Sequence, residues 1–545
     1  MMAAVLQMVR SGRLLSVGIW SVAILFVGLI TGAAAVIMPP MVSIGVVAMI
    51  GILLLWALPE MRAVPAQLLR RMFFLMVLVQ LCVPGYYAIE TGVLPWISIR
   101  RLVAATVILL FCITVAGSKA ARNKIVDTIR ASRLLAVLSL GFLLLLFLSI
   151  LTSKNPSQAL NGFVDAVLVW YVPLFACIFV VRTEKDIVLV LKIIATAGMI
   201  NASLGAVEFL LERRYYFDIF PKDMLDSMLA SNPALEQMYT ISTFRHGIYR
   251  ASSIYSVPLS FGEFAAMAAP VGAYFFFHGE RMRWRAFGVM TILASMGSLL
   301  ISGARGGYVA FLAAMPAMLF LWTLRYSRAN RNSILSALFA VFGMIGAGCV
   351  AVLILFSGKL SRTIFGGHET AASTSARFDQ FNMALPHIMG NPVTGHGRNT
   401  APDLVGFFTP GNIIPTIDSY LITLLVEQGV TGFVLFFGTI AWGVWIGAWL
   451  YIRNLDERAT LGAPIACSMI AFAVYRPVLS QTENHTLLFL MVGLMFALAR
   501  ASRDWKSEPK YSPPRFPNPG GWQQHQRPGP AAGRIASDPY SRPLR

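Results

Sequence analysis

Charged residues are scarce in this chain of 545 residues, making up 13% of it against 57% for hydrophobic residues. Soluble domains average about 25% charged and roughly 45–50% apolar residues. Apolar runs of about 18 or more residues recur along most of the sequence, which is typical of transmembrane helices. The scarcity of charge excludes a soluble enzyme, a disordered protein and a nucleic-acid-binding domain. The continuity of the runs excludes a β-barrel, whose strands would alternate with a period of two.

Several motifs of common chemistries are also missing. All five cysteines lie within apolar runs, so no disulfide framework is expected. No Gly-rich loop followed by Lys and Ser/Thr is present, which argues against an ATP-driven pump. There is no His-Glu-x-x-His segment and no Cys/His cluster at metal spacing. We therefore expect neither a metal site nor a cofactor.

The apolar runs predict an all-α polytopic membrane protein with about fourteen spans. The first run follows Arg10 and Arg13 and is too long for a signal peptide, so we interpret it as a span. The expected spans cover roughly residues 14–38, 41–58, 72–88, 102–117, 134–151, 163–181, 187–211, 257–277, 286–301, 305–324, 333–356, 418–451, 461–478 and 485–501.

The charge of the connections predicts the orientation. Lys and Arg concentrate in alternate connections, and the opposite short connections hold only Arg100, Arg101, Lys154, Arg305 and Arg476. Basic connections stay in the cytoplasm, so both termini are expected there. Two long loops, 212–256 and 357–417, are then periplasmic. We expect a cytoplasmic N-terminus (1–13), one transmembrane domain (14–504), and a Pro/Gly-rich basic tail (505–545) that is too poor in apolar residues to fold.

Unusual polar residues collect on the predicted outer face. Arg245 and Arg250 precede a span, and Arg305 lies in a tight Ser-Gly-Ala-Arg-Gly-Gly turn between two spans. A guanidinium group pairs with phosphate through two hydrogen bonds, so these arginines are candidates for holding an anionic head group. The alternatives are an interfacial anchor for Arg245 and Arg250, and a packing turn for Arg305.

The second half of the long loop holds a further group. Arg377 and His387 precede an Asn391–Gly397 turn that contains His396, and Asp418 opens the next apolar run. A single loop histidine is more often structural than catalytic, but an Arg, a His and an Asp at the mouth of membrane spans favour a site. Arg476 and His485 lie in a short outer connection, where they line the same vestibule or simply accompany a helix start.

The order of these segments resembles the O-antigen ligase and Wzy-type polymerase superfamily. The resemblance rests on Arg377, Asn391-Pro392, Gly395-His396-Gly397, Asp418-Ser-Tyr-Leu and Glu427-Gln-Gly-Val-Thr-Gly, with the upstream Ser302–Gly307 turn, and covers about residues 245–500. It implies a metal-independent, GT-C-like glycosyltransferase of the bacterial inner membrane. Such enzymes take a glycan from undecaprenyl pyrophosphate at the periplasmic face.

The resemblance also implies roles for residues. Arginines of the family are thought to hold the pyrophosphate, which assigns that role to Arg250, Arg305 and Arg377. Asp418 stands where ligases carry a histidine thought to deprotonate the acceptor hydroxyl, and this difference favours a polymerase. Asp418, with His396 as the alternative, is the expected base. The expected partners are the lipid-linked glycan donor and acceptor, membrane lipid and a chain-length-regulating envelope protein, without nucleic acid. O-antigen ligation and secondary transport are the alternatives.

Overall fold

The computed structural model describes residues 64–85, 88–89, 97–219, 222–231, 244–245, 247–330, 368–408 and 415–504, with the isolated positions Glu236, Tyr239 and Val341. The chain divides into two compact units, Met1–Glu508 and Pro509–Arg545, and every described residue belongs to the first. The predicted N-terminus 1–13 and tail 505–545 lie outside the described residues.

Helices make up nearly all of the described chain. The first half contains α4 (Ala66–Cys82), α5 (Ile99–Gly117), α6 (Lys119–Ala131), α7 (Arg133–Leu151), α8 (Pro156–Ala166), η1 (Val167–Tyr171), α9 (Val172–Val180), α10 (Glu184–Leu211), η2 (Tyr215–Ile219) and α11 (Lys222–Ser231). The second half contains α13 (Pro258–His278), α14 (Met282–Ser302), α15 (Arg305–Ala329), α18 (His368–Gly390), α19 (Ala401–Val405), α20 (Tyr420–Arg453), η3 (Glu457–Leu461), α21 (Gly462–Tyr475), η4 (Arg476–Val478) and α22 (His485–Asp504). Two antiparallel pairs of two-residue strands complete it: β1 (Ala88–Ile89) with β2 (Ile97–Ser98), and β3 (Phe244–Arg245) with β4 (Ile248–Tyr249).

The all-α prediction is confirmed, and the described residues contain ten helical segments long and apolar enough to cross a membrane. These ten coincide with ten of the fourteen predicted spans. The predicted span 72–88 falls on α4, which at 17 residues is shorter than the roughly 20 that a bilayer requires. The predicted spans 14–38, 41–58 and 333–356 lie outside the described residues, apart from Val341.

Local sequence signals explain where one helix begins and where another ends. Helix α10 begins at a capping box, in which Thr183 and Asp186 satisfy each other's backbone N–H groups. Helix α14 ends at Gly303, whose φ of 55° is the left-handed conformation that glycine adopts without strain. The chain therefore reverses at once, and α15 begins at Arg305.

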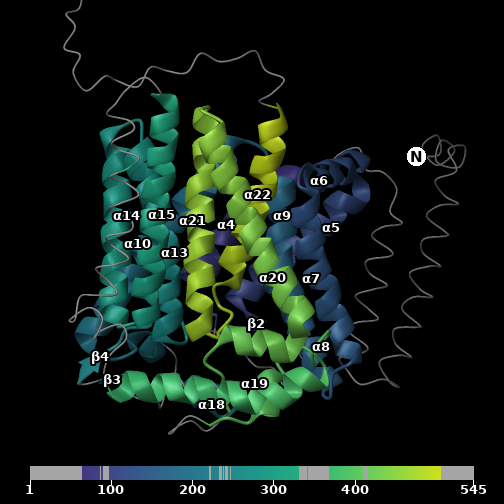
Figure 1. Cartoon of the computed structure of the whole chain (residues 1–545), viewed down its shortest axis with the longest axis vertical. Helices are drawn as coiled ribbons and strands as arrows, with labels where there is room; N and C mark the ends of the chain where they lie inside the picture. Colours follow the sequence, from purple (N-terminus) through teal and green to yellow (C-terminus); the bar gives the residue numbers. More distant parts are fainter. Residues whose placement is uncertain are drawn as a thin grey trace, which may run out of the picture. The chain divides into compact units, whose positions relative to one another are not determined.

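The connections sort to two ends of the helical bundle. Helix α6 lies at one end, and α18 crosses the other end together with β3 and β4 (Figure 1). Hydrogen bonds between segments distant in the sequence join connections at the same end of the bundle. Arg325 donates to the carbonyl of Asn454 at the α6 end, and Thr152 donates to the carbonyl of Gly395 at the α18 end. This separation follows the alternation that the basic residues predicted.

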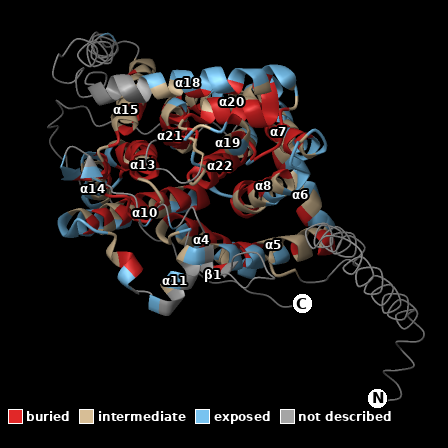
Figure 2. Cartoon of the chain, turned by 90° about the horizontal axis from the view of Figure 1, so that it is seen from below, coloured by how far each residue is buried: buried red, intermediate tan, exposed pale blue. Residues whose placement is uncertain are grey.

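Helices α13, α21 and α22 form the centre of the bundle. Most of their residues are buried, and Figure 2, viewed from the α18 end, shows them surrounded by the other spans. A smaller core lies beneath α18, where Ala384 and Ile388 pack with Ile417, Ile422 and Val426. This second core fixes α18 across the beginning of α20.

Candidate functional site

The first two predicted clusters meet at one turn. The Nε of Arg250 donates to the carbonyl oxygen of Ser302 at 2.9 Å, and the N–H of Ala251 donates to that of Ile301 at 3.0 Å. Gly303 is close to this arginine, because a Cβ there would lie 3.4 Å from its Nε. Arg250 and Arg305 therefore flank the same three-residue turn.

A buried carboxylate holds the backbone that carries Arg250. Glu208, in the last turn of α10, is fully buried and accepts hydrogen bonds from the Tyr249 hydroxyl at 2.9 Å and from the N–H groups of Ser252 and Ser253. Sequence reasoning missed Glu208, although a carboxylate inside an apolar run is itself a signal of function or of a specific partner.

The same segment is held from two further directions. Arg214 donates to the Ser252 hydroxyl at 3.2 Å and to the Ser256 carbonyl at 3.1 Å. Glu483, from the connection before α22, accepts from the N–H of Ser256 at 3.0 Å. Two nitrogens of Arg214, Nε and Nη1, are buried without a hydrogen-bond partner among the described residues. Arg214 thus places a second guanidinium beside the segment that carries Arg250.

The Asn-Pro-Val-Thr-Gly-His-Gly segment docks on a break in α20. The N–H groups of His396 and Gly397 donate to the carbonyls of Val426 and Glu427 at 3.0 and 2.8 Å, and Val430 donates back to the carbonyl of Pro392 at 2.8 Å. The break is at Gly429, where φ is 65° and ψ is −170°. Two motifs about 30 residues apart in the sequence are therefore a single structural unit.

This unit predicts that Gly429→Ala destabilises the protein. Gly429 occupies a backbone region that is essentially restricted to glycine, and an added Cβ would also collide with the carbonyl of Pro392. We expect a loss of about 1–3 kcal/mol or more, seen as a lower thermal unfolding temperature of the purified protein. Gly297→Ala in α14, where nothing in the described part of the chain lies within 4 Å of the added Cβ, is the matched control and should be close to neutral.

His396 is buried inside this unit. Its Nε2 lies 3.0 Å from the carbonyl oxygen of His387, and the two imidazole rings are 6.2 Å apart. Its Nδ1 is buried with no partner among the described residues. Burial lowers the pKa of His387, and the neighbouring Lys154 and His396 lower it further. Both predicted histidines therefore lie together, between the end of α18 and the break in α20.

Asp418 lies against α18. Its backbone N–H donates to Oε1 of Gln380 at 3.0 Å, and Arg377 lies three residues earlier, on the same face of α18. Burial raises the pKa of the Asp418 carboxyl, because the loss of hydration outweighs the positive field of Arg377. The Nε of Arg377 is buried and has no hydrogen-bond partner within the described ranges. The structure thus brings the predicted base and one predicted phosphate-binding arginine together.

Arg476 and His485 are buried beneath this site. The Arg476 guanidinium pairs with Glu263 of α13, and Asn484 donates to the other oxygen of that carboxylate at 2.9 Å. His485 stacks on Trp170, with ring centroids 4.7 Å apart, and contacts Tyr420 at the same distance. Both side chains are fully buried, so they support the site from inside the bundle rather than line an open vestibule.

Arg398 is a central residue that sequence reasoning missed. It is almost fully buried, lies 4.1 Å over the Trp170 ring, and donates to Asp165 at 3.1 Å and to Thr482 at 3.4 Å. One side chain therefore ties the long loop to η1 and its preceding helix α8, and to the connection before α22. Its only sequence signal is its position directly after the Gly-His-Gly motif.

The predicted residues fall into two groups. Arg250 and Arg305 share the turn after α14, and Arg377 and Asp418 share the contact between α18 and α20. Tyr420, two residues after Asp418, connects the second group to the buried Arg476, whose guanidinium lies 5.5 Å from the Tyr420 ring. The side chain of Arg245 lies outside the described residues.

Comparison with known proteins decides the class of this site. The O-antigen ligase family model matches residues 289–437, which includes the turn at Arg305, the whole of α18 and the break in α20. Residues 289–437 form an O-antigen ligase domain. The chain is accordingly a multi-pass membrane protein of the glycosyltransferase type, acting in O-antigen ligase or polymerase-type glycan transfer on lipid-linked glycans. No curated protein matches the chain.

The O-antigen ligase domain is narrower than the region 245–500 in which the sequence motifs were recognised. It contains five of the predicted site residues, namely Arg305, Arg377, His387, His396 and Asp418. Arg245, Arg250, Arg476 and His485 lie outside the matched residues, and Arg250 reaches the domain through its hydrogen bond to Ser302.

Proposed function

We propose that the protein polymerises undecaprenyl-pyrophosphate-linked oligosaccharide repeat units into a surface polysaccharide, O-antigen or exopolysaccharide, at the periplasmic face of the inner membrane. The observation that carries this proposal is Asp418, a partly buried carboxyl with a raised pKa beside Arg377 and at the foot of α20. In its ionised form, a carboxylate whose pKa is raised is a stronger base than an exposed one.

The proposed step is an inverting displacement at the anomeric carbon of the donor. An acceptor sugar hydroxyl attacks this carbon while its proton passes to the Asp418 carboxylate. The bond between the anomeric carbon and the pyrophosphate oxygen breaks, and undecaprenyl pyrophosphate leaves with the electron pair. Pyrophosphate is already a competent leaving group, so no metal is required by this proposal.

The arginines are assigned to the leaving group. Arg377 adjoins the base, and Arg250 and Arg305 flank the turn after α14. Guanidinium groups stabilise phosphate oxygens most strongly as negative charge develops on them during departure. Arg214 has two buried nitrogens next to the Arg250 segment that find no partner among the described residues, and it joins this group. His396 is the alternative base, since its buried Nδ1 is unpartnered in the described part of the chain.

The wider setting belongs to the same proposal. We assign about fourteen spans in a GT-C-like arrangement, both termini to the cytoplasm, and the loops 212–256 and 357–417 to the periplasm. The division into an N-terminus (1–13), a transmembrane domain (14–504) and a basic tail (505–545) follows from that topology. A chain-length-regulating envelope protein is the proposed partner.

The test is a reconstitution of the full-length protein in liposomes with undecaprenyl-pyrophosphate-linked oligosaccharide as the sole substrate and a chelator present. We expect a ladder of products of increasing length on a gel. Folded protein that yields no ladder with the native repeat unit would contradict polymerisation. A ladder that disappears only when chelator is added would contradict metal independence while leaving polymerisation standing.

The pH dependence of the reaction follows from the burial of Asp418. The base acts only when ionised, so the rate should fall as the pH drops through its pKa, and this acid limb should lie above the usual aspartate value of about 3.9. Arg377 lowers that pKa, so Arg377→Gln should move the acid limb of the residual activity to higher pH. Arg213→Gln, an exposed arginine paired with Asp218, is the control and should leave the limb in place.

O-antigen ligation is the second candidate, because the matching family model is described as O-antigen ligase. Its acceptor would be lipid A-core instead of another repeat unit. Adding lipid A-core to the same liposomes distinguishes the two reactions. If lipid A-core moves to a single higher band on the gel, and no ladder forms when lipid A-core is left out, the reaction is ligation and not polymerisation.

A further inference from the structure

A groove opens at the α6 end of the bundle, at the opposite end of α20 from Asp418. It has a volume of about 360 Å³ and lies between the start of α7, the second half of α20 and the end of α22. Every described residue that lines it lies outside the matched span 289–437. The groove is therefore not part of the O-antigen ligase domain.

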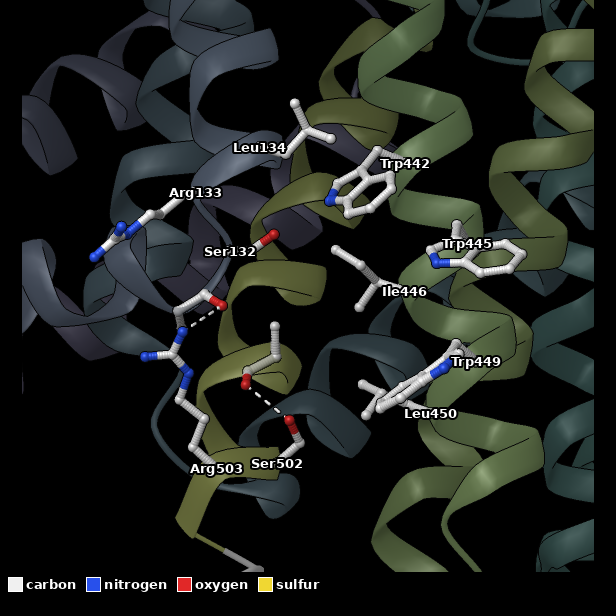
Figure 3. Close-up of a pocket in the computed structure, with 12 residues that line it drawn as sticks. Ser132, Arg133, Leu134, Trp442, Trp445, Ile446, Trp449, Leu450, Ser502 and Arg503 are labelled. Carbon is white, nitrogen blue, oxygen red and sulfur yellow. Dashed lines mark hydrogen bonds between the residues drawn. The ribbon is translucent and has the colours of Figure 1, made fainter.

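One wall of the groove is aromatic. Trp442, Trp445 and Trp449 follow one another along one side of α20, with Leu134 of α7 nearby (Figure 3). Trp445 and Trp449 are 59% and 38% exposed, so the described chain leaves a large part of both side chains uncovered. Tryptophan concentrates at the boundary between the acyl chains and the head groups of a membrane. This wall therefore suits the upper part of an acyl chain.

The opposite wall and the rim are polar and basic. Ser132, Ser502 and Arg503 lie on the side opposite the tryptophans, where the Ser502 hydroxyl donates to the carbonyl of Ala499, and Arg133 projects away from the groove (Figure 3). Arg503 donates to the carbonyls of Arg130 and Ala131, which neutralises the negative end of α6.

None of the twelve described residues that line the groove is acidic, and Arg453, which lies 5.3 Å over the Trp449 ring, adds a third positive charge nearby.

We propose that this groove binds one anionic phospholipid, with an acyl chain along the three tryptophans and the phosphate at Arg133 and Arg503. A positive rim above an apolar wall matches the two parts of such a lipid, and a basic side chain near an anionic membrane surface strengthens binding about fivefold. The predicted topology places this rim at the cytoplasmic leaflet. The proposal does not depend on polymerisation, since the groove lies outside the O-antigen ligase domain.

The experiment uses full-length protein in phosphatidylcholine vesicles that contain increasing amounts of phosphatidylglycerol with brominated acyl chains, which quench tryptophan fluorescence on contact. We expect quenching that saturates at a low fraction of phosphatidylglycerol, and weaker quenching by brominated phosphatidylcholine. Changing Trp442, Trp445 and Trp449 together to Phe should remove the saturating signal. Arg133→Gln with Arg503→Gln should weaken the apparent affinity about thirtyfold.

Arg281→Gln with Arg283→Gln is the matched control, because both arginines are exposed at the start of α14, outside the groove and in another predicted cytoplasmic connection. An equal loss of affinity in this variant would show a diffuse charge effect and overturn the proposal. Equal quenching by brominated phosphatidylcholine would overturn it as well. Cross-linking of two copies through Trp445→Cys, with no saturating quenching in the wild type, would show that protein occupies the groove instead.

Discussion

Asp418→Asn should reduce glycan transfer by about 10²–10⁴-fold, the usual contribution of a positioned general base. Asparagine keeps the shape of the side chain and leaves the hydrogen bond from the backbone of residue 418 to Gln380 in place, but it cannot accept the proton of the acceptor hydroxyl. The measurement is the initial rate of ladder formation in liposomes at equal amounts of folded protein.

Stability separates this catalytic effect from misfolding. Because burial raises the pKa of Asp418, its charged carboxylate destabilises the folded state when the pH is above that pKa. This destabilisation disappears as the pH falls through the pKa. The neutral asparagine removes the same destabilisation, so the unfolding temperature at pH 7 should not fall. Asp379→Asn, an exposed carboxyl next to Gln380 on α18, is the control and should keep full activity. An active Asp418→Asn would transfer the role of base to His396.

Arg476→Met should have the largest effect on stability, about 3–5 kcal/mol. The Arg476 guanidinium and the Glu263 carboxylate are both fully buried, so removal of one partner leaves an uncompensated charge in the centre of the bundle. The guanidinium also donates to the carbonyl of Gln481 at 2.9 Å and lies 4.4 Å over the Phe472 ring. We expect a large drop in the thermal unfolding temperature and in the yield of folded protein.

A double variant tests the cause of that loss. Glu263→Gln combined with Arg476→Met removes both charges, so it should recover a large part of the stability lost in Arg476→Met alone. Arg213→Gln breaks the exposed pair with Asp218, at 3.2 Å, and should cost less than about 1 kcal/mol. A double variant no more stable than Arg476→Met would show that the packing of the guanidinium, and not its charge, is what the fold requires.

Sequence reasoning identified the residues near the site but not how they are grouped. Arg377 and Asp418 are 41 positions apart, and only the packing of α18 across the beginning of α20 makes their charges interact. Burial raises the pKa of Asp418 and Arg377 lowers it, and both effects depend on that packing. His396 was proposed as the alternative base because it is near Asp418 in the sequence, and only the structure shows that its Nε2 lies 3.0 Å from the carbonyl oxygen of His387.

Buried carboxylates were the main omission. Glu208 and Glu263 lie inside apolar runs, where they do not interrupt the hydropathy of the span enough to stand out. Their partners come from distant segments, because Glu208 binds the backbone at Ser252 and Glu263 binds Arg476. A search for acidic residues within the predicted spans would have found both, since such residues are retained only with a partner or a function.

The sequence by itself determined that this is an all-α membrane protein and where most of its spans lie, because long apolar runs and the placement of basic residues are local properties. It also determined the order of the family motifs. The tertiary structure alone decided which of these motifs touch. The break at Gly429 joins two of them through backbone hydrogen bonds, and the left-handed turn at Gly303 brings Arg250 and Arg305 together. Such contacts depend on how helices pack, which no local pattern of residues specifies.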